Sequence, residues 1–96
     1  MIDYHKTAEI IYVSKGWGYE KWIVNKSEYC GKLLFIFKDK KCSWHYHKLK
    51  DETFYVQSGK IKLFWTMNSY VENIVLSKGD VWHVPPGQIH QMLALE

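Results

Sequence analysis

The sequence contains no arginine: all 13 basic residues are lysines, and against 10 acidic residues they give a formal net charge of +3. Arginine supplies the bidentate guanidinium fork that most often recognises phosphate groups and guanine edges, whereas lysine acts only as a point charge. The lysines are scattered along the chain and form no basic stripe. The sequence therefore predicts no nucleic-acid partner.

Long apolar segments are also absent. The longest apolar run covers residues 33–37, far short of the roughly 20 residues that a membrane-spanning helix needs. Residues 1–8 lack the apolar centre of a secretory signal. The two cysteines, Cys30 and Cys42, have no CxxC spacing, and without a signal they are expected to be thiols rather than a disulfide. We therefore expect a cytoplasmic, soluble protein with no membrane partner.

Helical periodicity is scarce, and short runs rich in β-branched and aromatic residues take its place. At 96 residues, of which 17% are aromatic, the chain is expected to form one domain, residues 1–96, with an all-β core. Runs of this length between turn signals predict a sandwich or small barrel. The predicted strands are residues 9–13, 20–24, 32–37, 43–47, 53–57, 60–66, 71–76, 81–84 and 90–95.

One predicted strand shows clear alternation. In residues 60–66, lysines alternate with Ile61, Leu63 and Trp65. Because successive strand side chains point to opposite faces, these three residues should face the interior, and Lys60 and Lys62 should face solvent.

Two histidines with strand spacing, His45 and His47, form the first part of a candidate metal site. On a strand, side chains two residues apart lie on one face and can reach a common ion. Glu52 follows after a short turn and opens the next predicted strand. If that strand pairs with residues 43–47, it brings the carboxylate back beside both imidazoles.

The fourth candidate ligand, His90, follows the turn Pro85-Pro86-Gly87. Fixed proline φ and glycine freedom allow such a turn to set the return angle of the chain. Three imidazoles and one carboxylate suit a divalent transition metal such as Zn, Mn, Fe, Co or Ni and leave positions open for water or substrate. A single histidine would more simply be exposed or hydrogen-bonded without metal, but the combined spacing favours a metal site.

The spacing of these residues resembles the two motifs of the cupin superfamily. His45-x-His47-x4-Glu52-x6-Gly59 resembles the first motif, and Gly79-x5-Pro85-x-Gly87-x2-His90 resembles the second. The resemblance covers about residues 30–95. It implies a double-stranded β-helix, or jelly-roll barrel, with the metal held inside by the four candidate ligands. The chain departs from these motifs at Asp39, where a glycine is usual, and at Ala94, where an asparagine is usual.

Within the cupins, Trp17-Gly18 and the run from Glu52 to Gly59 are similar to the cupin domain of type II mannose-6-phosphate isomerases and bifunctional mannose-1-phosphate guanylyltransferases. That resemblance implies a sugar or sugar-phosphate isomerase or epimerase. This chain has His45 where that family has glutamine, and Lys50 and Gln91 where it has arginines.

The candidate catalytic residues are Lys50, which could bind phosphate or act as an acid or base, and His83, which could act as a base. Each has a simpler interpretation, as a solvated lysine and as a structural histidine. Two other functions therefore stay open: an Fe(II)-dependent dioxygenase, and a cupin that binds a carbohydrate or small acid without reaction. Cupins commonly add a strand after the position of His90, so we expect a homodimer that covers the sheet edge.

Overall fold

The computed structural model describes residues 10–26, 28–48 and 50–96, apart from the side chain of Met67. These residues form strands and turns and contain no helix, which confirms the predicted all-β fold. Residues 1–8, which lack the apolar centre of a secretory signal, and Glu9, the start of the first predicted strand, lie outside the described residues. By its contacts the chain divides into two compact units, Met1–Phe35 and Ile36–Glu96. A single domain over residues 1–96 stays a prediction.

The first unit is a three-stranded antiparallel arrangement in the order β1-β2-β3. The strands are β1 (Ile11–Lys15), β2 (Gly18–Asn25) and β3 (Cys30–Ile36), the last residue of β3 belonging to the second unit. Aromatic side chains pack on this sheet: the Tyr19 and Phe35 rings stack with centroids 5.1 Å apart.

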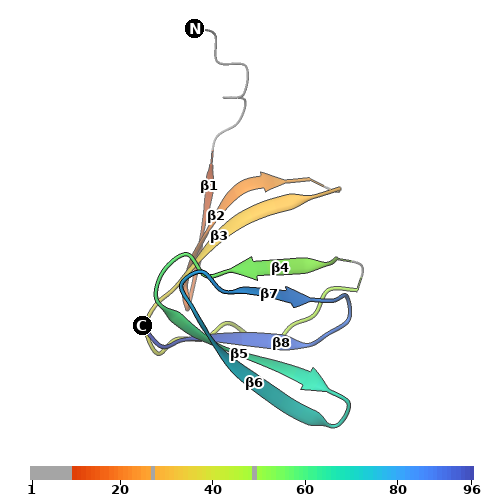
Figure 1. Ribbon diagram of the computed structural model, residues 1–96. Helices are drawn as coiled ribbons and strands as arrows, with labels where there is room; N and C mark the ends of the chain where they lie inside the picture. The colour runs from red at the N-terminus through yellow and green to blue at the C-terminus, as the bar shows by residue number, and fades with distance from the viewer. Residues whose placement is uncertain (1–9, 27, 49) are drawn as a thin grey trace, which may run out of the picture. The chain divides into compact units, whose positions relative to one another are not determined.

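The second unit contains two antiparallel sheets. One pairs β4 (Glu52–Tyr55) with β7 (Val81–Val84), and the other has the order β6 (Tyr70–Ser77), β5 (Lys60–Met67), β8 (His90–Ala94). Figure 1 shows the β4–β7 pair lying over β8 and β5.

The interior of the second unit lies between these two sheets. Leu63 on β5 is fully buried, and Trp65 on the same strand packs against Trp82 of β7 with ring centroids 4.8 Å apart. Lys60 is exposed, as the predicted alternation requires, whereas Ile61, Lys62 and Trp65 are all half-buried. The alternation along β5 is therefore confirmed at Lys60 and Leu63 only. Burying one such apolar side chain contributes about 1.5–3 kcal/mol. The buried apolar residues of the described chain are Cys42, Val56, Leu63, Leu76, Val84, Met92 and Ala94.

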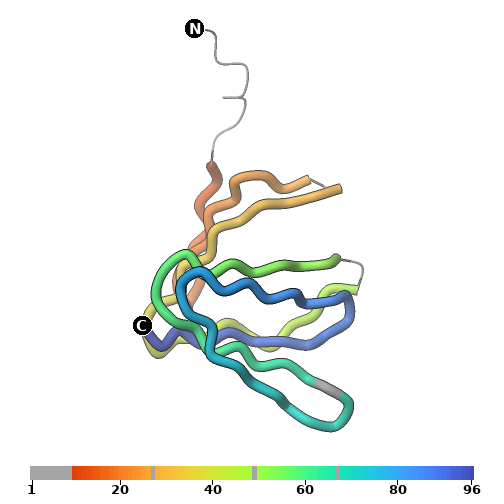
Figure 2. The backbone as a smooth tube through the Cα atoms, viewed as in Figure 1, coloured from red at the N-terminus to blue at the C-terminus, as the bar shows by residue number. Residues whose placement is uncertain are grey.

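The prediction of a strand over residues 43–47 is wrong. This segment runs antiparallel to β8, as the chain path in Figure 2 shows, but makes only isolated bridges, Lys41 with Leu93 and His45 with His90. The stretch from Lys41 to His45 is one residue longer than the stretch of β8 that it faces. Such an extra residue is a β-bulge, which interrupts the ladder and bends the chain.

The two cysteines are not bridged: Cys30 is exposed and Cys42 is buried. No helix in the described ranges is long and apolar enough to cross a membrane.

Candidate metal centre

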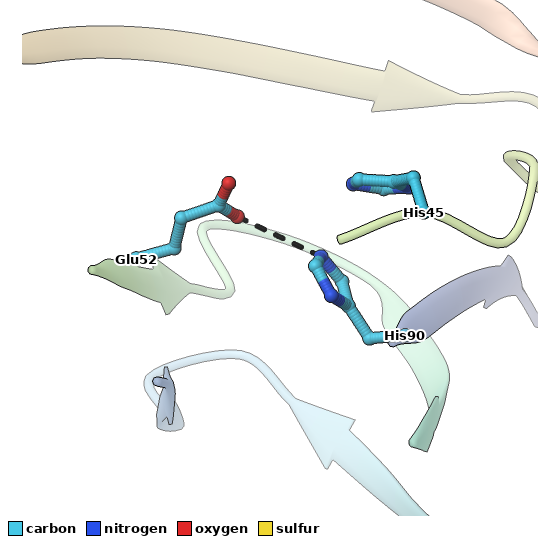
Figure 3. Close-up of side chains that lie close together, drawn as sticks. All are labelled: His45, Glu52 and His90. Carbon is cyan, nitrogen blue, oxygen red and sulfur yellow. Dashed lines mark ion pairs between the residues drawn. The ribbon is translucent and has the colours of Figure 1, made fainter. Parts of the chain in front are cut away.

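Three of the four predicted ligands converge in the second unit. Figure 3 shows the side chains of His45, Glu52 and His90 directed toward one another. One ligand atom from each lies within 4.8 Å of the other two, close enough to share an ion. His90 is fully buried, whereas His45 and Glu52 are half-buried. The arrangement could hold a metal ion at the end of the interior.

Backbone pairing places the two histidines together. The His45 amide donates to the His90 carbonyl at 3.1 Å, and the His90 amide donates to the His45 carbonyl at 2.9 Å. Their ring centroids are 4.2 Å apart. The bulge in the segment before His45 therefore does not separate the ligands, because regular antiparallel pairing is restored at this position.

Glu52 reaches the site by a route that the sequence did not indicate. We expected its strand to pair with residues 43–47, but β4 pairs with β7, and Glu52 lies opposite Val84. The carboxylate thus comes from the sheet that faces the histidines. The expectation was wrong because the bridge that this segment makes joins His45 to His90 on β8.

Each histidine of the group is oriented by a backbone carbonyl two residues before it. Nδ1 of His45 lies 2.9 Å from the carbonyl oxygen of Ser43, and Nδ1 of His90 lies 3.0 Å from that of Gln88. A carbonyl oxygen only accepts hydrogen bonds, so Nδ1 carries the proton in both rings. Nε2 of each neutral ring then presents its lone pair to the site, the arrangement typical of metal-bound histidine.

The Nε2 atom of His90 is buried and has no hydrogen-bond partner among the described residues. A buried polar atom left unpaired costs about 1–3 kcal/mol, and native structures seldom keep one without an ion or water. Its nearest acid is Glu52, whose Oε2 is 3.7 Å away, too far for a hydrogen bond. A metal ion between these atoms would satisfy both.

Glu52 and His90 each stabilise the charged form of the other. Partial burial raises the pKa of Glu52, but its contact with His90 and the nearby charges of His47, His90 and His45 bring the pKa below its ordinary value. For His90, burial lowers the pKa, while Glu52 and the Gln88 carbonyl together raise it above its ordinary value. The carboxylate is thus held ionised, the form that binds metal.

His47, the remaining predicted ligand, contacts Glu52 rather than joining the compact group. Its Nε2 lies against Oε1 of Glu52, and its ring centroid is 5.4 Å from that of His45 and 6.4 Å from that of His90. His47 therefore lies beside the three residues and engages the same carboxylate. Its role as the fourth ligand stays a prediction.

Aromatic side chains adjoin the group. The ring of Phe54 is 5.9 Å from that of His90, and Trp65 lies opposite His90 in the β5–β8 register. Trp82 lies opposite Phe54 and contacts Trp65. Its indole nitrogen is buried without a hydrogen-bond partner in the described chain. The β4–β7 register places Trp82 on the same face of this pair as Glu52 and Phe54.

The candidate catalytic residues lie outside this group. Lys50 is exposed. His83 lies opposite Thr53, on the face of the β4–β7 pair away from Glu52, and its Nε2 is 2.8 Å from Oδ1 of exposed Asp51. His83 is thus directed away from the candidate ligands, no contact between Lys50 and these ligands is seen among the described residues, and a catalytic role for both residues stays a prediction.

Gln91, at the position of the family's second arginine, also faces away from the candidate ligands. It follows His90 on β8, so its side chain lies on the opposite face of the sheet. There it is buried, and its Nε2 donates to the carbonyl of Cys42 at 2.7 Å.

The comparisons with known proteins agree with this geometry. A solved structure described as CapF with inhibitor 3-isopropenyl-tropolone matches with a TM-score of 0.80 and 18% sequence identity over 95% of this chain. The match covers 28% of that chain, and at this identity it shows the fold alone. A search of curated proteins gives no match. The family model described as Cupin domain matches residues 35–96, which contain the whole second unit and all the candidate ligands. The chain therefore belongs to the cupin family and has its jelly-roll fold.

Proposed function

We propose that this cupin holds a divalent transition metal through His45, Glu52 and His90, with His47 as fourth ligand, and binds a small oxygen-rich molecule there. The observation that carries the proposal is the buried Nε2 of His90, which has no hydrogen-bond partner within the described residues while its Nδ1 is anchored. Two or three imidazoles with one carboxylate suit Zn, Mn, Fe, Co or Ni. Such a set leaves coordination positions open for a ligand.

The adjoining aromatic residues support a carbohydrate or small acid as the ligand. The Phe54 ring lies beside His90, and Trp65 is the strand neighbour of His90. Aromatic rings of this kind can pack against the C–H face of a sugar ring. The indole N–H of Trp82 meets no acceptor in the part of the chain that the structure describes, and a ligand oxygen would supply one. The inhibitor named for CapF is a tropolone. Tropolones bind metals through two adjacent oxygens, which makes tropolone a suitable probe here.

The reaction that best fits such a site is sugar or sugar-phosphate isomerisation or epimerisation. A bound metal would supply Lewis-acid polarisation of a carbonyl oxygen. The interior residues would orient the ring and limit access of water. Proton transfer needs a base within hydrogen-bond reach of the substrate. Because His83 lies on the outer face and Lys50 is exposed, binding without reaction is the second candidate function.

The test is to load purified, metal-stripped protein with Zn²⁺ or Co²⁺ and then titrate tropolone, following the absorbance of the chelate. We expect one ion per chain and saturable tropolone binding that needs the ion. Failure of the wild-type protein to bind either ion would refute the proposal.

A panel of hexoses and hexose phosphates, followed by NMR with the loaded protein, separates the two candidate functions. Interconversion that stops on chelation supports the isomerase or epimerase, whereas ligand-induced thermal stabilisation without product supports the binding function.

A further inference from the structure

Gln91 is a buried polar side chain on the face of β8 opposite the candidate ligands. With 8% of its surface exposed, its amide must be hydrogen-bonded to avoid a desolvation penalty. Its Nε2 donates to the carbonyl oxygen of Cys42 at 2.7 Å. The bond joins two residues that are distant in sequence. Gln91 directly follows His90, and Cys42 lies three residues before His45.

Cys42 lies where the bulge begins, and its bonds to β8 are unusual. Its amide donates to the Met92 carbonyl at 3.1 Å, but the Met92 amide donates to the Cys42 thiol sulfur at 3.2 Å. In a regular ladder that amide would be paired with a backbone carbonyl. Because sulfur is a weak acceptor, the bond from Gln91 to the Cys42 carbonyl is the stronger side-chain restraint at this end of the bulge.

The segment from Cys42 to His45 is therefore fixed at both ends. The far end is held by the two backbone bonds between His45 and His90. Between these ends lies Ser43, whose carbonyl accepts the Nδ1 proton of His45. The path of the bulge decides where that carbonyl points, and the carbonyl decides how the His45 ring is turned.

We propose that Gln91 is a positioning residue for the metal centre: by holding the Cys42 carbonyl it fixes the bulge that aims the Ser43 carbonyl at His45. This inference rests on the proposed metal-binding function. In this role Gln91 orients the ligand His45 and does not contact substrate. The Gln91 side chain and the metal centre lie on opposite faces of the sheet.

The test compares Gln91→Met, which keeps the length and removes the donor, with Gln57→Met, the same change at an exposed glutamine. Zn²⁺ and Co²⁺ affinities are measured by competition with a chromophoric chelator, together with thermal unfolding of the metal-free proteins. Loss of partners beyond the ligands typically weakens metal binding 10–100-fold. We expect Gln91→Met to bind about tenfold more weakly and to change the visible Co²⁺ spectrum, and Gln57→Met to match wild type.

A purely structural role gives a different result. If Gln91→Met lowers the unfolding temperature but keeps the wild-type metal affinity and Co²⁺ spectrum, the inference is overturned. If wild-type protein binds no ion, the proposed function fails instead, so the two failures are distinguishable.

A second measurement covers the case in which Gln91→Met does not fold. In wild-type protein, the side-chain amide NMR signals of Gln91 should shift on saturation with Zn²⁺, and those of Gln57 should not. Unmoved Gln91 signals in a zinc-saturated protein would count against coupling between this side chain and the site.

Discussion

His45 and His90 lie directly opposite each other and exchange both of their backbone hydrogen bonds, at 3.1 and 2.9 Å. Two candidate ligands from distant parts of the sequence thus share one antiparallel pair. Their separation is set by backbone geometry, and Glu52 completes the group from the facing sheet. Metal binding at the proposed centre should therefore depend on these three side chains more than on neighbouring surface residues.

Replacing His90 with alanine should abolish high-affinity metal binding. The change removes one of three converging ligands, and we expect the affinity for Zn²⁺ to fall by at least about 100-fold, since even indirect partners cost 10–100-fold. The measurement is competition with a chromophoric chelator, supported by elemental analysis. His83→Ala is the matched control, because His83 lies on the outer face. Equal affinities of the two variants would contradict the assignment of His90.

The stability of the metal-free protein should pass through a maximum with pH. The Glu52 pKa is lowered from 4.5, so its contribution is present above pH 4.5 and is lost as the pH falls through the lower folded pKa. The His90 pKa is raised from 6.5, so its contribution is present below pH 6.5 and is lost as the pH rises through the higher folded pKa. Urea unfolding in the presence of a chelator should show greatest stability between these values.

The control for this pH profile is Glu52→Gln, which removes the carboxylate common to both shifts. The variant should lose the acid limb that Glu52 contributes, and its alkaline limb should weaken because His90 loses its charged partner. A Glu52→Gln profile with the same shape as wild type would show that other groups govern the pH dependence.

Leu63→Ala should destabilise the fold strongly. Leu63 is fully buried between the sheets of the second unit, and such truncations cost about 2–5 kcal/mol because a cavity remains. Val75→Ala on β6 is the comparison, because Val75 is 47% exposed and should change stability by no more than about 0.5 kcal/mol. Urea unfolding curves measure both. Similar losses for the two variants would show that Leu63 is not a core residue.

Gly87→Ala should cost about 1–2 kcal/mol through backbone strain alone. Gly87 has φ of 83°, which favours glycine, and nothing lies within 4 Å of the position of an added Cβ. Gly16→Ala is the matched control, since its surroundings are equally open and its φ is not positive. Thermal unfolding should separate the two variants. Because the Gly87 amide donates to the His47 carbonyl at 2.7 Å, strain at this turn should also weaken metal binding.

The positions of the strands could be predicted from the sequence better than the pairing between them. Alternating lysines and apolar residues correctly placed Leu63 inside and Lys60 outside on β5, because side-chain direction in a strand follows from local geometry alone. The pairing of Glu52 with Val84 could not be predicted, since it depends on which distant segment occupies each sheet edge.

The irregular backbone of the segment before His45 was not predicted from the sequence. Its composition is typical of a strand, but the pattern of residue types does not reveal a bulge that depends on the thiol of Cys42 and the amide of Gln91. The ligand spacing still predicted that His45 and His90 would meet. The candidate ligands could be named from the motif, whereas the hydrogen bonds that orient their rings became visible only with the backbone path.

The carbonyl groups that orient the two histidines belong to the backbone at Ser43 and Gln88. Side-chain substitutions at these positions leave the acceptors in place. Both imidazole rings should therefore keep their orientation when Ser43 or Gln88 is replaced. A single-residue insertion or deletion between Cys42 and His45, or between Gln88 and His90, would instead displace the acceptor. In variant libraries, these short stretches should accept many substitutions and almost no change of length.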